Sequence, residues 1–175
     1  MVDSQGRERR WLNRVMWESG RTLFCTPAEV FGKGINPFYP QSDEPPARVD
    51  KIHVGLVKAL LEKSWCAETA TRGKWSSEVP SLNQCKVSAL VVQELLGGEL
   101  LRCDMTNGDS HYWNRLPDGS EVDLTTDQFR HIDGKPLRET VIVMDRSYVL
   151  SYPDTMRRYA ILLQRVAYAL WGEPE

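Results

Sequence analysis

Two segments in the middle of the chain carry apolar residues at helical spacing. The first follows Asp50, which we expect to act as the N-cap of a helix. The second begins at Cys85 and is expected to stop at Gly97 and Gly98, because glycine commonly ends helices. The apolar positions are Ile52, Leu56, Leu60 and Leu61 in the first segment and Val87, Leu90, Val91 and Leu95 in the second. The pattern therefore predicts two helices that each bury one face.

Beyond these helices the spacing of apolar residues changes from helical to alternating. Residues 99–105, 110–116 and 121–129 alternate apolar and polar positions, and the turn sequences TNGD and PDGS separate them. This pattern predicts an antiparallel meander of three strands. Residues 141–144, VIVM, add a further strand or edge segment, and residues 155–171 return to helical spacing as a terminal helix. Helices packed on one small antiparallel sheet make the predicted fold class α+β.

The first 47 residues differ from the rest of the chain and are interpreted as an N-terminal extension. Residues 11–24 predict a short amphipathic helix, and a proline-rich arm follows it. The arm carries Phe38 and Tyr39, which we expect to wrap against the main domain and close over its site. Residues 48–175 then form the α+β domain.

Composition argues against several classes of function, nucleic-acid binding among them. The 175 residues fit one domain, and the 22 basic and 24 acidic residues give a net charge of -2, without the basic surplus that nucleic-acid binding uses. No apolar run approaches the roughly 20 residues that cross a bilayer, so we expect no membrane association and a cytoplasmic location. The four cysteines, at positions 25, 66, 85 and 103, contain no CxxC pair, and we expect them to be reduced thiols.

Cys85 is the first candidate for a chemically reactive residue in the sequence. A thiol in the first turn of a helix is exposed to the partial positive charge of unpaired amides, which favours the thiolate. His111 falls on the second predicted strand and Asp123 on the third. A turn centred on Asp118 and Gly119 brings Asp123 within a residue or two of the position opposite His111. An imidazole oriented by a carboxylate beside a thiol is the arrangement that nucleophilic acyl chemistry requires.

Several strings of the sequence resemble one family. They are SWCAET, PSLNQC followed by VSALVVQELLGGEL, HYWNRLPDGSEVDLTTDQF and TMRRYAILLQRV, and together they span roughly residues 52–170. They resemble the small bacterial YunG family of uncharacterised proteins, whose pattern is in turn similar to papain-like and transglutaminase-like thiol enzymes. The resemblance implies a papain-like or transglutaminase-like core, with Cys85 as nucleophile, His111 as general base and Asp123 as the group that orients the imidazole. One departure is Asn83, where the family pattern is expected to have glycine before the glutamine.

The residues around the thiol are candidates for binding substrate or stabilising an oxyanion. The backbone amide of Cys85 is the expected first donor, and the second donor is left open. Gln84 and Asn83 precede the thiol, and Trp75 and Trp113 offer indole donors or pocket walls. Structural alternatives stand beside these roles, because cysteine is often a core residue and Trp113 or Tyr112 must face the core of an alternating strand.

Two functions from different classes are consistent with the sequence. The first is a thiol enzyme that hydrolyses an amide, ester or thioester, or transfers its acyl group, with a small-molecule or peptide substrate. The second is a non-catalytic ligand-binding or accessory protein that keeps the same shell. The ligand-binding alternative would be favoured if His111 formed hydrogen bonds only within the sheet. It would also be favoured if Asp123 served only to cap the turn that begins with DLTT. Cys85, Cys103, His111 and Asp123 include no close-spaced ligand pair, so we expect no metal. No glycine-rich phosphate loop opens a helix, so we expect no cofactor, and the pattern predicts no particular oligomeric state.

Overall fold

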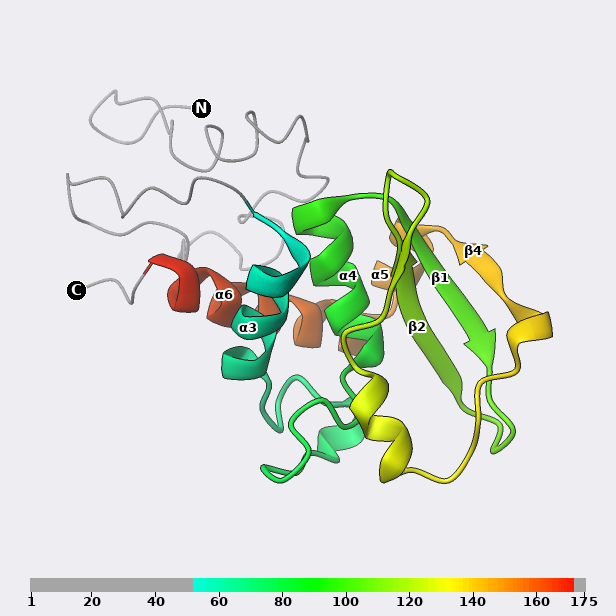
Figure 1. Cartoon of the computed structure of the whole chain (residues 1–175). Coiled ribbons are helices and arrows are strands. Elements are labelled where there is room, and N and C mark those ends of the chain that lie inside the picture. Colours follow the sequence, from blue (N-terminus) through cyan, green and yellow to red (C-terminus); the bar gives the residue numbers. More distant parts are fainter. Residues whose placement is uncertain (1–51, 172–175) are drawn as a thin grey trace. The chain divides into compact units, whose positions relative to one another are not determined.

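The structure, a computed structural model, describes residues 52–171 (Figure 1). The predicted N-terminal extension, including Phe38 and Tyr39, and the predicted N-cap Asp50 lie outside the described residues. The helices are α3 (Val54–Ser64), α4 (Cys85–Leu96), α5 (Arg146–Leu150) and α6 (Pro153–Trp171), and the strands are β1 (Glu99–Asp104), β2 (Ser110–Arg115), β3 (Glu121–Val122) and β4 (Ile142–Met144). The same described residues include the short 3-10 helices η1 (Thr71–Gly73), η2 (Thr126–Arg130) and η3 (Arg138–Thr140). The α+β class is confirmed.

The helices pack as the apolar periodicity predicts. The prediction of Asp50 as the N-cap of the first helix is wrong: the N-cap of α3 is His53, whose Nδ1 accepts the backbone N–H of Leu56 at 3.3 Å. Helix α4 begins at Cys85 and ends at Leu96, and its C-cap is Gly97, whose positive φ of +85° glycine adopts easily. Figure 1 places α4 between the sheet and the helix pair α3 and α6. Among the helices of residues 52–171, none has both the length and the apolar character that crossing a membrane requires.

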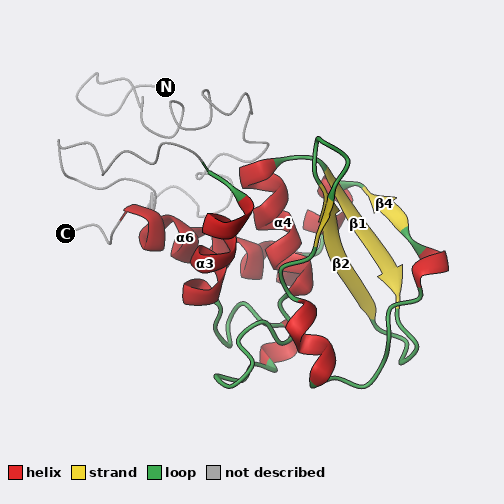
Figure 2. Cartoon of the chain, viewed as in Figure 1, coloured by secondary structure: helices red, strands yellow, loops and turns green. Residues whose placement is uncertain are grey.

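The strands form one antiparallel sheet in the order β3-β2-β1-β4 (Figure 2). One face, with Leu100 and Tyr112, joins α3, α4 and α6 in the main hydrophobic core. The opposite face buries Leu101, Cys103 and Trp113 in a smaller apolar cluster, against which Val141 packs. Tyr112 and Trp113 therefore fill two different cores, as neighbours on a strand must.

The predicted third strand is wrong beyond Val122. Strand β3 has only two residues, which pair with Asn114 and Arg115 of β2 in the register that the PDGS turn predicts. The Asp123 carboxylate accepts the backbone N–H and the hydroxyl of Thr125, both at 3.0 Å, and this local turn ends the strand before η2. Within residues 52–171, no strand pairs with the part of β2 around His111 on this side.

Strand β4 confirms the expectation of an edge segment at residues 141–144. Among the strands of residues 52–171 it pairs only with β1, and Ile142 and Val143 are exposed. Helix α5 follows directly and was not predicted.

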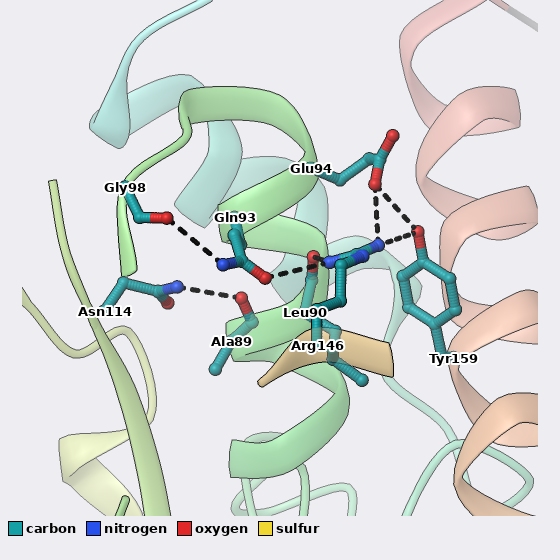
Figure 3. Close-up of polar contacts among 8 residues, drawn as sticks. All are labelled: Ala89, Leu90, Gln93, Glu94, Gly98, Asn114, Arg146 and Tyr159. Atoms are coloured by element: carbon teal, nitrogen blue, oxygen red, sulfur yellow. Dashed lines mark hydrogen bonds and ion pairs between the residues drawn. The ribbon is translucent and has the colours of Figure 1, made fainter. Parts of the chain in front are cut away.

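Arg146 of α5 joins three helices in a buried polar cluster (Figure 3). Its guanidinium contacts the Glu94 carboxylate at 2.6 Å and donates to the Tyr159 hydroxyl at 2.7 Å and to the Leu90 carbonyl oxygen at 3.0 Å. Glu94 and Leu90 belong to α4 and Tyr159 to α6, so one side chain links α4, α5 and α6. This cluster holds the carboxyl-terminal half of α4, at the opposite end of the helix from Cys85.

Candidate active site

Cys85 is the first residue of α4 and is partly exposed. The first backbone N–H groups of a helix have no intrahelical acceptor, and the side chain of the N-cap residue, Gln84, makes no capping hydrogen bond here. The helix also has no acidic residue in its first turn. The Cys85 sulfur therefore lies at a helix end whose partial positive charge is not compensated locally.

The segment between α3 and η1 fixes the amino end of α4. The Trp65 indole donates to the Ser88 hydroxyl at 2.8 Å, and the Gln84 side-chain amide donates to the Cys66 carbonyl oxygen at 3.0 Å. Arg158 of α6 donates to the Thr69 carbonyl oxygen at 3.3 Å. The string SWCAET is thus bonded to the two helices that flank it, which positions the thiol.

His111 lies on β2 and is almost fully buried. Its Nε2 is 2.6 Å from Oδ2 of Asp123. The Phe129 ring meets the imidazole edge-on at 4.6 Å between centroids, and the Trp113 ring stacks against it at 5.7 Å. Because Nε2 is used by Asp123, Nδ1 is the nitrogen left for a further partner.

The electrostatic surroundings of His111 include the thiol. Burial alone would lower its pKa, but hydrogen bonds with Asp123 and Cys85, together with the charges of both groups, outweigh burial and raise the pKa of His111 to about 9. An imidazole with this pKa is protonated at neutral pH. The structure therefore brings together the three residues Cys85, His111 and Asp123 that the sequence proposed as a catalytic set.

Asp123 uses both carboxylate oxygens. Oδ2 contacts His111, while Oδ1 accepts from the backbone and side chain of Thr125, which is itself buried. The carboxylate cannot rotate without losing one set of bonds. Asp123 therefore caps the local turn and also contacts His111, the two arrangements considered for this residue from the sequence.

A basic residue, Lys86, follows Cys85 in the sequence, and the charge of Cys85 favours its protonated form. Lys86 Nζ lies over the ring of Tyr112, 4.9 Å from its centroid. Tyr112 pairs across the sheet with Arg102, whose guanidinium contacts Asp104 at 2.6 Å and Ser110 at 2.9 Å. This basic cluster, Lys86 with Arg102 and Tyr112, lies on the face of the sheet that packs on α4.

No metal-binding cluster was found in this part of the chain. Within residues 52–171, no group of three or more His, Cys, Asp or Glu side chains is arranged to hold a metal ion. Cys66, Cys85 and Cys103 are all free thiols.

Comparison with known proteins places the chain in a family. Residues 53–170 match the family described as YunG protein. The chain belongs to the YunG family. It is 35% identical over 74 residues to the protein named Uncharacterized protein YunG of Bacillus subtilis (strain 168), a stretch that covers 42% of this chain and 61% of that protein. The chain thus spans less than two thirds of the length of this relative. No solved structure matches the chain.

The backbone conformation at position 83 accounts for asparagine where a glycine was expected from the YunG family. The φ of Asn83 is +60°, in the left-handed region, which asparagine tolerates better than most residues other than glycine. The side-chain amide of Asn83 donates to the Lys74 carbonyl oxygen at 2.7 Å. The backbone carbonyl oxygen of Asn83 accepts the N–H of Thr71 at 2.9 Å. Asn83 therefore fixes the loop before the thiol to the segment around η1.

The side chains of the other candidate binding residues of this YunG-family protein form hydrogen bonds within the fold. Gln84 is fully buried, and its donor is directed at Cys66 while its Oε1 has no partner within residues 52–171. The Trp75 indole donates to the Pro80 carbonyl oxygen at 3.2 Å within its own loop. The Trp113 indole donates to Glu121 at 2.9 Å, while its ring supports His111. Their substrate-binding roles stay predictions.

Sequence reasoning did not single out Lys86. One signal was present in the sequence, because a basic residue in the first turn of a helix opposes the preference of that end for negative charge. Departures from local preference are expected mainly at functional sites. The contact of Lys86 with Tyr112, however, arises only from packing of α4 on β2.

Proposed function

We propose that this YunG-family protein is a cysteine-dependent enzyme that attacks the carbonyl carbon of an amide, ester or thioester, with hydrolysis or acyl transfer as the outcome. The observation that carries the proposal is the position of His111, bonded through Nε2 to Asp123 and coupled to Cys85. An oriented imidazole beside a thiol at a helix end is the arrangement by which cysteine nucleophiles are activated.

The proposed reaction uses each of these groups in turn. In the reactive pair the proton of Cys85 is already on Nδ1 of His111, in keeping with the raised pKa of the imidazole, and the sulfur forms a bond to the carbonyl carbon while the carbonyl oxygen becomes negative. The backbone N–H of Cys85 is the proposed donor to that oxygen. The bond to the leaving group then breaks, and His111 returns the proton to the leaving atom. Water or an amine attacks the resulting thioester, His111 takes the proton of that nucleophile, and the thiol is released with the proton.

The architecture supports the same proposal. A cysteine at the start of a helix, followed along the chain by a histidine on an antiparallel strand and then by an aspartate, is the order of a papain-like or transglutaminase-like core. Here α4 supplies Cys85, β2 supplies His111, and the turn after β3 supplies Asp123. The use of Nδ1 towards the sulfur and Nε2 towards the orienting group follows from the 2.6 Å contact with Asp123.

The proposal is tested by alkylation with iodoacetamide at pH 6.5, with each cysteine followed by peptide mass spectrometry. An unassisted thiol with a pKa of about 8.5 is only about 1% thiolate at this pH, so assistance by His111 should accelerate labelling of Cys85 about 10- to 100-fold over Cys66. His111→Gln should remove this advantage. Cys66 is a suitable internal standard because it is also a partly exposed free thiol.

A turnover assay with 4-nitrophenyl acetate provides the second measurement. The expected result is a burst of one 4-nitrophenolate per chain, which Cys85→Ala abolishes and Cys66→Ala preserves. Labelling of Cys85 that is no faster than that of Cys66, together with no burst, would reject the enzyme and favour the ligand-binding alternative.

A further inference from the structure

Lys86 occupies an electrostatically unfavourable position. It is the second residue of α4, where the helix end is already partly positive, and no acidic residue lies in the first turn. Its side chain is partly buried, and its ammonium group lies over the Tyr112 ring. Burial lowers the pKa of Lys86, and the charges of Arg158 and Arg102 oppose its proton further, while Cys85 and Asp154 favour it.

The other cations near Lys86 have their own partners. Arg102 is bonded to Asp104 at 2.6 Å, and Arg158 is bonded to Asp154 at 2.8 Å. Within residues 52–171, Lys86 forms no ion pair. Asp154 favours the positive charge of Lys86, but no carboxylate within residues 52–171 forms a direct ion pair with it.

The Cys85 thiolate can balance Lys86 only before the reaction. When the sulfur bonds to a carbonyl carbon, the resulting thioester carries no charge. A partly buried ammonium group would then face no anion, at a cost that an anionic group on the bound acyl compound removes. The π-face of Tyr112 fixes the direction of the ammonium group without neutralising it.

We infer that Lys86 binds a carboxylate carried by the acyl substrate of Cys85, so that the substrate class is a carbonyl compound with an anionic group a few bonds from the carbon under attack. This inference rests on the proposed function, because it assigns the substrate class of the same site. Arg102, held by Asp104 and Ser110, pairs across the sheet with Tyr112, whose ring lies under the Lys86 ammonium group.

The first test compares two alkylating reagents of nearly equal size, iodoacetate and iodoacetamide. In both reactions the Cys85 thiolate forms a bond to carbon and iodide leaves, so the ratio of their rates cancels the thiolate population. Relative to the ratio for 2-mercaptoethanol, iodoacetate should be favoured about three- to tenfold at Cys85, as expected for one partly screened ion pair. Lys86→Gln should abolish the preference, and Lys58→Gln, which removes the same charge from the exposed face of α3, should keep it.

An equal loss of rate with both reagents in Lys86→Gln would overturn the inference, because Lys86 would then act on the thiolate alone. A second measurement does not depend on reactivity. In the Cys85→Ala chain, millimolar succinamate should shift the NMR signals of the Tyr112 ring, whereas neutral butyramide should not, and Lys86→Gln should weaken succinamate binding at least threefold. Absence of this binding would overturn the inference even if Cys85 is catalytic. Binding of succinamate to a protein whose Cys85 is inert would instead reject the enzyme and keep the anion subsite.

Discussion

The protonation of His111 links the candidate site to the stability of the fold. Its pKa of about 9 lies above the ordinary value of 6.5. The folded state therefore binds this proton more tightly than the unfolded chain does. The resulting stabilisation is fully present below about pH 6.5 and is lost as the pH rises through 9. At roughly 1.4 kcal/mol per pKa unit, the proton on this buried side chain contributes about 3 kcal/mol to the free energy of unfolding.

Urea unfolding between pH 6 and pH 10 tests this coupling. The difference in unfolding free energy between the intact protein and His111→Gln should shrink by about 3 kcal/mol across this range. NMR titration of the three histidines of the chain measures the same event directly. In Cys85→Ala the His111 titration should move to lower pH, because Cys85 contributes both a hydrogen bond and a charge that raise the pKa. A His111 signal that titrates near pH 6.5 in the intact protein would refute the reasoning.

Three further substitutions test the fold, each by urea unfolding. Gly98→Ala should cost more than 2 kcal/mol, because a Cβ at φ +83° would lie 2.0 Å from a carbonyl oxygen of β2, whereas Gly108→Ala, at φ +84° in open space, should cost only about 1 kcal/mol. Arg146→Leu should cost about 3–5 kcal/mol by leaving Glu94 buried without its cation, and adding Glu94→Leu should recover most of the loss. Asn83→Gly should stay within about 1 kcal/mol of the intact protein, while Asn83→Ala should lose about 1–2 kcal/mol. Equal costs within any of these pairs would contradict the stated cause.

Local signals in the sequence predicted most of the elements of the fold. Helix α4 was predictable because its apolar residues keep one period and Gly97 ends it, and the strands β1 and β2 because a turn separates two alternating runs. Helix α5 has five residues, too few for a periodic pattern. The third strand was predicted too long because the Asp123 carboxylate accepts two hydrogen bonds from Thr125 and forms a turn directly after Val122.

The candidate site was predictable only in part. The position of Cys85 follows from the helix, and the proximity of His111 and Asp123 follows from the turn register. The partners of Gln84 did not follow from sequence, because its amide meets a carbonyl oxygen 18 residues away. Lys86 meets Tyr112 only when α4 packs on β2. The catalytic roles of these residues stay predictions.

The double use of the Asp123 carboxylate constrains which tautomer His111 can adopt. Oδ1 must accept the N–H of Thr125, so an asparagine at this position would keep its oxygen there and turn its NH₂ group towards His111. Nε2 would then have to accept, so the imidazolium could not form there, and the one proton of the neutral ring would lie on Nδ1, where it would prevent His111 from holding the thiol proton. Asp123→Asn should thus yield a folded chain with an imidazole of the wrong tautomer. Replacing one carboxylate oxygen of Asp123 by the nitrogen of an amide should therefore preserve the fold and abolish the reactivity of Cys85.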